Sequence, residues 1–329
     1  MSSLKEVAEI AGVSPATVSR VMNNTIFVSP ETREKVEAAI EKVHYKPNII
    51  AQSLRLKATK NIGLLVPEID NPSFSLVIKH IVNSAAKRGL NTIVCNTANN
   101  IAIEAHIIDK LVRQSINGII FIRVSDESHV VNVTRTTKVP MIVLDRAFNN
   151  EYIPNITIDN YFAGTLAAKH LISRGRKNIA TITGMFNISL SRERHQGFID
   201  TLKKYDVEVS QKLIYQGGFS YQAGVDGVLN FLENNLEFDG LWGQNDLIAA
   251  GALSTLLHHN KKIPQDISIV GMDNVLFSSY MYPSITTIAQ PYEAMCDKAV
   301  ELIDKLTNNE GVEQNHFSFP PSLIVRESS

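Results

Sequence analysis

Cysteine is scarce in this chain: Cys95 and Cys296 are the only two among 329 residues. A fold that depends on a disulfide framework is therefore excluded, and so is a zinc site built from a cluster of cysteines. Both cysteines lie in apolar stretches, which favours two buried, reduced thiols over a disulfide. We expect neither a metal ion nor a cofactor.

Long apolar runs are also missing from the sequence. The chain opens with MSSLKEVAE, which has no apolar signal core, and no stretch reaches the length that a membrane-spanning helix needs. We therefore expect a soluble, cytoplasmic protein with no membrane partner.

The common motifs of enzymes are absent as well. The sequence has no P-loop, no G-x-G-x-x-G, no H-E-x-x-H and no Cys/His spacing typical of a metal site. Ser191, His195 and Asp145 could be combined into a catalytic triad on paper, but no G-x-S-x-G nucleophile elbow accompanies them. The sequence therefore predicts a protein that is not an enzyme.

An overall excess of basic charge is missing too, since the formal net charge is −1. The first 60 residues differ from the rest, because nine lysines and arginines face six glutamates there, for a net charge of +3. The remainder carries −4. This positive balance is mild, so the placement of single side chains decides more than the sum does.

The stretch from residue 4 to residue 23 has the pattern of two short helices joined by a tight turn. Apolar residues recur at three- and four-residue spacing in its first half, and again at Val18 and Val21. Gly12 stands where a turn favours a residue without a Cβ, and Ser14 can cap the second helix. This pattern predicts a helix-turn-helix, whose second helix enters the major groove of DNA. An ordinary helical hairpin with a solvated face is the alternative.

Residues of the second helix that lie off its apolar stripe are the candidates for DNA contact. Arg20 can read guanine, because a guanidinium bonds O6 and N7 together. Ala16 can contact a thymine methyl group, whereas Thr17 and Ser19 can hold phosphates or base edges. The predicted DNA contacts in this helix and its cap are Ser14, Pro15, Ala16, Thr17, Ser19, Arg20 and Asn23.

A third helix is predicted to complete the N-terminal core. Ser29 can cap it and Pro30 suits its first position. Val36, Ile40 and Val43 then face inward at helical spacing.

At this point the residues resemble the LacI/GalR family of bacterial transcription regulators. The resemblance is carried by LKEVAEIAGVSPATVSRVMN, VSPETREKVEAAIEKVHYKPN, the pattern A-x-S-L-R at 51–55, and IGLLVPEIDNPSF, and it covers essentially the whole chain. It implies a homodimer that binds near-palindromic operator DNA and responds to a small-molecule effector. We expect a repressor that a sugar releases from its operator, although some members of the family are co-repressed by their ligand.

The segment 48–56 is too short to form a stable helix alone, because the free-energy cost of nucleating a helix exceeds the stabilisation that two helical turns provide. We expect it to fold as a hinge helix when paired with its twin on DNA. Leu54 would then be the apolar wedge that opens a base step in the minor groove. The predicted DNA contacts of this hinge are Ala51, Ser53, Leu54 and Arg55.

From residue 61 onward, continuous apolar runs alternate with helical patterns, which predicts βαβ units and parallel sheets. The predicted strands are Ile62–Pro67, Thr92–Asn96, Gly118–Ile122, Met141–Leu144, Asn178–Gly184, Leu213–Gln216, Gly240–Gly243, Ile267–Gly271 and Ile285–Ile288. The predicted helices are Phe74–Arg88, Ala102–Gln114, Arg192–Lys204, Tyr221–Asn234, Asp246–His258 and Tyr292–Leu306. Two similar α/β halves follow from this alternation.

The predicted fold is an N-terminal all-α helix-turn-helix domain followed by an α/β domain of two lobes. The second part resembles the periplasmic sugar-binding fold, which implies that the chain crosses back to the first lobe before its last helix. We expect a DNA-binding domain at 1–47, a hinge at 48–60, and an effector-binding and dimerisation domain at 61–329. Within the last, the expected lobes are about 61–160 with 290–321, and about 161–289.

Ligands of parallel α/β sheets bind beyond the carboxyl ends of the strands. Aromatic and polar residues follow several of the runs here, and such a mixture suits a sugar. Asp246 is expected to cap its helix, and Asp145 with Arg146 could instead form a structural ion pair. The predicted effector contacts are Asn71, Ser73, Phe74, Asp145, Arg146, Arg192, Arg194, Phe219, Asn245, Asp273 and Gln290.

Nearly all of these residues resemble positions that hold ribose in ribose-binding proteins. Ser73 departs from that pattern, which has a second phenylalanine there, and Arg192 is not part of it. The resemblance implies ribose or a related pentose as the effector. A sugar phosphate is the competing interpretation, because Arg146, Arg192 and Arg194 would supply positive charge. A sugar receptor without a regulatory role would need a secretory signal and would lack residues 1–60.

Overall fold

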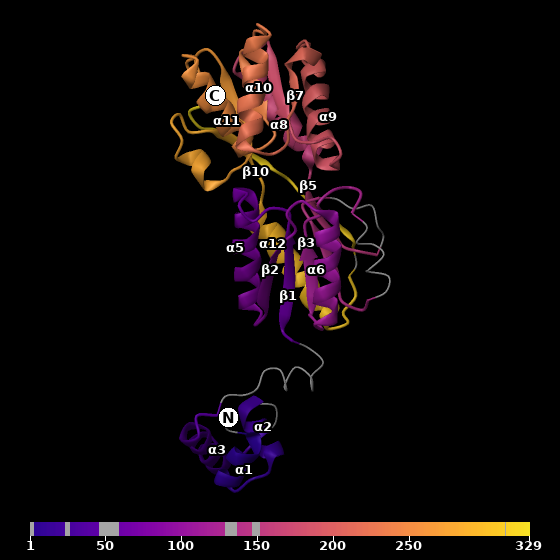
Figure 1. Ribbon diagram of the computed structural model, residues 1–329, viewed down its shortest axis with the longest axis vertical. Helices are drawn as coiled ribbons and strands as arrows, with labels where there is room; N and C mark the ends of the chain where they lie inside the picture. Colours follow the sequence, from indigo (N-terminus) through magenta and orange to yellow (C-terminus); the bar gives the residue numbers. More distant parts are fainter. Residues whose placement is uncertain (1–2, 24–26, 46–58, 129–136, 147–151, 313) are drawn as a thin grey trace. The chain divides into compact units, whose positions relative to one another are not determined.

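The computed structural model describes residues 3–23, 27–45, 59–128, 137–146, 152–312 and 314–329. The chain divides into two compact units, Met1–Thr59 and Lys60–Ser329 (Figure 1). Each unit has its own hydrophobic core.

The first unit consists of three helices, as the sequence predicts: α1 (Leu4–Ala11), α2 (Pro15–Asn23) and α3 (Pro30–Lys42). Gly12 ends α1 in the left-handed region, with a φ of 66°. A capping box between Ser3 and Glu6 begins α1, and the sequence analysis did not anticipate it. The buried core is Val7, Ala8, Ala11, Val18, Val21, Val36 and Ala39.

The second unit begins with a parallel sheet in the order β11-β5-β4-β3-β1-β2. Its helices cover both faces, because α5 and α12 pack into one apolar cluster and α6 into another. This first lobe contains β1 (Asn61–Val66), α5 (Pro72–Lys87), β2 (Asn91–Asn96), α6 (Ile101–Arg113), β3 (Gly118–Phe121), β4 (Met141–Leu144), β5 (Asn155–Ile158), α12 (Tyr292–Thr307) and β11 (His316–Phe319).

A second sheet has the order β12-β10-β9-β8-β6-β7, in which β12 alone runs antiparallel to its neighbour among the pairs described. Residues of α8 and α9 cover one face, and residues of α10 and α11 cover the other. This second lobe contains α8 (Asn160–Ser173), β6 (Ile179–Thr183), α9 (Ser189–Lys204), η1 (Gln211–Leu213), β7 (Ile214–Gln216), α10 (Tyr221–Glu233), β8 (Gly240–Gly243), α11 (Asp246–His258), β9 (Ser268–Asp273), η2 (Leu276–Ser279), β10 (Thr286–Ala289) and β12 (Ser322–Ile324).

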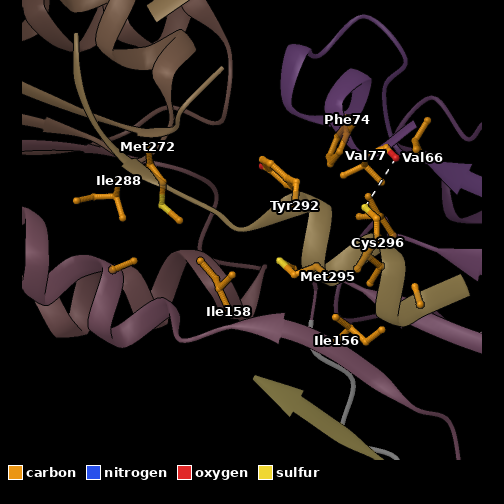
Figure 2. Packing of buried hydrophobic residues seen from close by; sticks show 14 of the residues in the cluster. Val66, Phe74, Val77, Ile156, Ile158, Met272, Ile288, Tyr292, Met295 and Cys296 are labelled. Atoms are coloured by element: carbon orange, nitrogen blue, oxygen red, sulfur yellow. Dashed lines mark hydrogen bonds between the residues drawn. The ribbon is translucent and has the colours of Figure 1, made fainter. Parts of the chain in front are cut away.

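The chain passes between the two lobes at three places: from β5 to α8, from β10 to α12, and from β11 to β12. The sequence analysis expected the second passage, near residue 290. It missed the strands β5, β11 and β12 and the helix α8, so it did not anticipate the last return. Figure 2 shows that one apolar cluster continues along these passages, from Ile156 and Met295 to Met272 and Ile288.

The two cysteines differ in burial, contrary to the sequence analysis. Cys296 of α12 is buried, with its thiol 3.8 Å from the carbonyl oxygen of Val77, and burial raises the pKa of that thiol (Figure 2). Cys95 is only partly buried, because β2 is the edge strand of its sheet. Both thiols are free.

No helix in the described residues is long and apolar enough to cross a membrane.

Candidate functional site

The exposed face of α2 is the candidate surface for reading DNA. Pro15, Ala16 and Arg20 are exposed on it, whereas Val18 and Val21 on the opposite face are buried in the three-helix core. One cation and two small side chains therefore stand on the solvent side of a helix whose other side is fixed by packing. This arrangement is what a recognition helix needs in order to enter a major groove.

The start of α2 is fixed by its own hydrogen bonds. The Ser14 Oγ accepts a hydrogen bond from the backbone N–H of Thr17 at 3.1 Å and lies 2.9 Å from the Thr17 Oγ1. Ser14 is thus the N-cap that the sequence predicts. Thr17, a predicted DNA contact, also takes part in this cap. Ser19 is half-buried. The predicted contacts Ala51, Ser53, Leu54 and Arg55 lie outside the described residues, and the side chain of Asn23 is not described.

A cavity of about 650 Å³ lies at the carboxyl ends of the strands in the second unit, lined by residues of both lobes. Its size is in the range of small-molecule sites. Every predicted effector contact except Arg192 lines it. The sequence analysis missed several further lining residues, among them Glu68, Glu127 and Tyr292.

The first-lobe wall of the cavity combines an aromatic ring with a buried cation. Phe74 lies in the first turn of α5, which Asn71 caps by accepting from the N–H of Ser73 at 3.1 Å. The Arg146 guanidinium carbon lies 5.9 Å from the centroid of the Phe74 ring. Its Nη1 donates to the carbonyl oxygens of Arg123 (2.7 Å) and Val124 (2.6 Å). Burial lowers the pKa of Arg146, which the nearby Asp145 carboxylate partly offsets.

The ion pair between Asp145 and Arg146, an alternative in the sequence analysis, is not among the ion pairs of the described residues. Both side chains instead face the cavity. Asp145 and Asp273 also have positive φ angles, 69° and 106°. Strained backbone of this kind is found at ligand sites, where the surrounding structure maintains it.

The second-lobe wall holds its polar groups through fixed contacts. Arg194 Nε donates to Asn160 Oδ1 at 2.9 Å, and its Nη1 donates to the Gln244 carbonyl at 3.0 Å. Asn245 caps α11 by accepting from the N–H of Ile248 at 2.8 Å, and its Nδ2 donates to the carbonyl of Phe219. The side chains in this wall are therefore held in fixed orientations by contacts within the protein.

Asp273 is the buried acid of the cavity. Its Oδ1 accepts from Gln290 Nε2 at 2.7 Å and from the Tyr292 hydroxyl at 3.3 Å. Burial raises the pKa of Asp273 to about 6, although the positive charge of Arg194 opposes that rise. Figure 2 shows Tyr292 at the start of α12, close to where the chain passes between the lobes. Tyr292 follows Gln290 by two residues, which is the signal that could have found it.

Three polar atoms of cavity residues are buried without a hydrogen-bond partner in the described part of the chain: Asp145 Oδ1, Arg146 Nε and Gln290 Oε1. A buried polar atom without a partner costs about 1–3 kcal/mol. Two acceptors and one donor among the lining residues therefore lack a partner within the described protein.

Arg192 does not line the cavity, which corrects its predicted role. Its Nη2 lies 2.9 Å from Asp126 Oδ2 in the first lobe, and its Nη1 donates to the carbonyl of Phe186. Arg192 and Arg194 are two residues apart near the start of α9, so they point in different directions from the helix. Of these two arginines, only Arg194 lines the cavity.

Asp246 is not the helix cap, which corrects a second prediction. Asn245 caps α11, and the Asp246 carboxyl is fully buried, accepting from Thr287 Oγ1 at 2.6 Å and from the N–H of Val275 at 2.9 Å. Burial, followed by the negative charge of Asp273, raises the pKa of Asp246 to about 8.

This raised pKa predicts that stability falls as the pH rises from neutral. The unfolded chain ionises Asp246 near pH 4, whereas the folded chain keeps it protonated until about pH 8, so folding takes up a proton in between. We expect this group to lower the unfolding free energy by about 1 kcal/mol between pH 7 and pH 8. Asp246→Asn should remove that part of the slope in urea denaturation. The exposed Asp226→Asn is the control, and equal slopes for both variants would contradict the prediction.

Comparison with known proteins agrees with this division into a helical unit and a two-lobed unit. The family model described as "Bacterial regulatory proteins, lacI family" matches residues 3–48. The model described as "Periplasmic binding proteins and sugar binding domain of LacI family" matches residues 59–307. Among curated relatives, the HTH-type transcriptional repressor PurR of Serratia proteamaculans (strain 568) is 33% identical over 330 residues, covering 100% of this chain and 97% of the relative.

Two solved structures are informative. A lac repressor dimer bound to operator and the anti-inducer ONPF has a TM-score of 0.90 at 27% identity, covering 99% of this chain and 98% of that one. A periplasmic binding protein/LacI transcriptional regulator from Alkaliphilus metalliredigens QYMF, complexed with D-xylulofuranose, has a TM-score of 0.71 at 29% identity. That match covers 82% of this chain and 99% of the other.

Proposed function

The chain belongs to the LacI family of DNA-binding transcriptional repressors, and on that premise we propose that its effector is ribose or a closely related pentose. The observation that carries this proposal is the effector cavity itself. The residues that resemble a ribose site converge there from both lobes, with Phe74 and Phe219 among its lining. Aromatic rings can pack on the C–H faces of a sugar, while fixed polar groups read its hydroxyls.

The charges of the cavity favour a neutral sugar over a sugar phosphate. The carboxylates of Glu68, Glu127, Asp145 and Asp273 line it, and they outnumber the described cations of the lining, Arg146 and Arg194. Both arginines already donate hydrogen bonds to protein oxygens. A phosphate would therefore be repelled by four acids, while the two guanidinium groups that could attract it are already partly committed to protein oxygens. The regulator complexed with D-xylulofuranose, a five-carbon sugar, supports the same chemical class.

In the proposed mechanism, a homodimer places two α2 helices on a near-palindromic operator in the cytoplasm. The dimer bound to operator among the similar structures supports that assembly. Effector binding closes the two lobes over the cavity, rearranges the dimer and releases the operator. A coupling free energy of about 1–3 kcal/mol suffices for such a change. The hinge at 48–56, including Leu54, belongs to this proposal although it lies outside the described residues.

Calorimetry with a panel of ligands tests the effector. The panel is D-ribose, ribose 5-phosphate, fructose, sucrose and galactose, with adenine added because two phenylalanine rings can also hold a planar base. We expect D-ribose to bind tightest, and ribose 5-phosphate to bind more weakly. If a hexose, a disaccharide or adenine binds while ribose and its phosphate do not, the effector assignment is wrong and the family membership is unaffected.

The same ligands, added to the protein on an operator fragment selected in vitro, test the direction of the response. We expect the bound ligand to lower operator affinity in fluorescence anisotropy. Tighter operator binding would contradict the proposed release and would make the ligand a co-repressor.

A further inference from the structure

Asp126 of the first lobe is contacted by two side chains from the start of α9 in the second lobe. Arg192 Nη2 lies 2.9 Å from its Oδ2, and Ser189 Oγ donates to its Oδ1 at 3.3 Å. Arg123 Nη1, from the same loop, lies 3.7 Å from Oδ1. These contacts join the two lobes directly, beside the effector cavity rather than inside it.

The loop that carries Asp126, residues 122–128, is itself tied to the cavity. The buried Glu104 of α6 accepts from the N–H of Val124 at 2.9 Å and from the Ser128 hydroxyl. On the other side, Arg146 donates to the carbonyls of Arg123 and Val124. Arg146 and Val124 both line the cavity. The position of Asp126 therefore depends on the same arginine that faces the effector.

We propose that Asp126, Arg192 and Ser189 form an interlobe latch, which holds the lobes closed over a bound effector and so sets its residence time. These three are positioning residues, because none of them lines the cavity. A ligand enclosed between two lobes leaves only after they open, and opening breaks every contact that joins them. The latch thus acts on the dissociation rate constant of an enclosed ligand. The inference rests on the proposed function only for the choice of ribose as probe.

The latch is accessible enough for water and salt to weaken it. The side chains of Arg192 and Asp126 are 51% and 29% exposed. An ion pair of this exposure changes an equilibrium about two- to fivefold, and salt screens it. This is the size of effect that would tune the lifetime of a closed complex without being required for folding.

Stopped-flow measurement of D-ribose dissociation from the full chain tests the latch. Arg192→Gln and Asp126→Asn should each raise the dissociation rate constant about two- to fivefold. The double variant should raise the dissociation rate constant no more than either single variant does, because Asp126 and Arg192 act as one pair. Arg113→Gln, which removes an exposed ion pair within α6, is the matched control. The proposal would be overturned by an unchanged dissociation rate constant in both single variants. It would also be overturned if the free-energy effects of the two substitutions were additive in the double variant.

Hydrogen exchange on the ligand-free chain tests the latch without any effector. Arg192→Gln in the second lobe should speed amide exchange in residues 122–128 of the first lobe, while Arg113→Gln should not. Unchanged amide exchange in residues 122–128 would overturn the proposed latch even if ribose binds. Faster exchange in a chain that fails to bind ribose would support the latch and reject only the proposed effector.

Discussion

Replacing Asp273 with alanine is expected to weaken D-ribose binding by at least about 2 kcal/mol, which is about 30-fold in affinity. The carboxylate is buried and accepts from Gln290 and Tyr292, so it is a fixed acceptor in the lining of the cavity. Its removal leaves those two donors and any sugar hydroxyl without a partner. Isothermal calorimetry measures the loss, and Asp226→Ala, which removes an exposed acid of the second lobe, is the control.

The same carboxylate predicts how binding depends on pH. Sugar hydroxyls donate to the ionised form, and burial raises the pKa of Asp273 to about 6. Binding should therefore be strongest above that value and should weaken as the pH falls through it toward 5. Asp273→Asn should bind ribose weakly at all pH values and lose this dependence. A wild-type affinity that stays constant between pH 5 and pH 8 would show that Asp273 does not accept from the ligand.

Arg20→Ala is expected to weaken specific operator binding by about 1–3 kcal/mol and to relax the preference at one base pair. The reason is the place of Arg20 on the exposed face of α2, opposite the buried Val18 and Val21. Its removal changes no core contact, so the N-terminal unit should keep its thermal stability. Lys35→Ala, which removes one positive charge from the exposed side of α3, is the matched control.

Gel-shift titration on operator variants separates a specific role of Arg20 from a general one. Loss of affinity for all DNA sequences alike, to the same extent as in Lys35→Ala, would mean that Arg20 contacts phosphate only. Unchanged affinity and unchanged base preference would remove it from the recognition surface.

The N-terminal unit could be predicted from sequence because its signals are local. Gly12, Ser14 and Ser29 mark helix ends within a few residues of the apolar positions they serve, and the structure confirms all three. Helix α8 has a cap in Asp159, and its buried residues recur at three- and four-residue spacing. Its exposed side also carries the large apolar residues Tyr161 and Phe162, so the contrast between an apolar and a polar face is weak. Strands β11 and β12 are short and partly exposed, so no apolar run marks them.

The candidate site could be predicted in its location but not in every side chain. The rule that ligands bind beyond strand ends brought together residues that the structure also places around one cavity. It could not distinguish Arg192 from Arg194, because the direction of a side chain depends on where α9 begins. A shift of one residue likewise separates the cap Asn245 from the buried Asp246.

The three passages between the lobes have a consequence for synthesis on the ribosome. Neither sheet is complete until residues 316–324 have been made, because β11 closes the first and β12 closes the second. The apolar face that α12 covers in the first lobe must wait for almost the whole second lobe to be translated. The three N-terminal helices, by contrast, have a core of their own that is complete by residue 45. A nascent chain therefore acquires its candidate DNA-reading surface long before it acquires the cavity through which, on our proposal, an effector controls it.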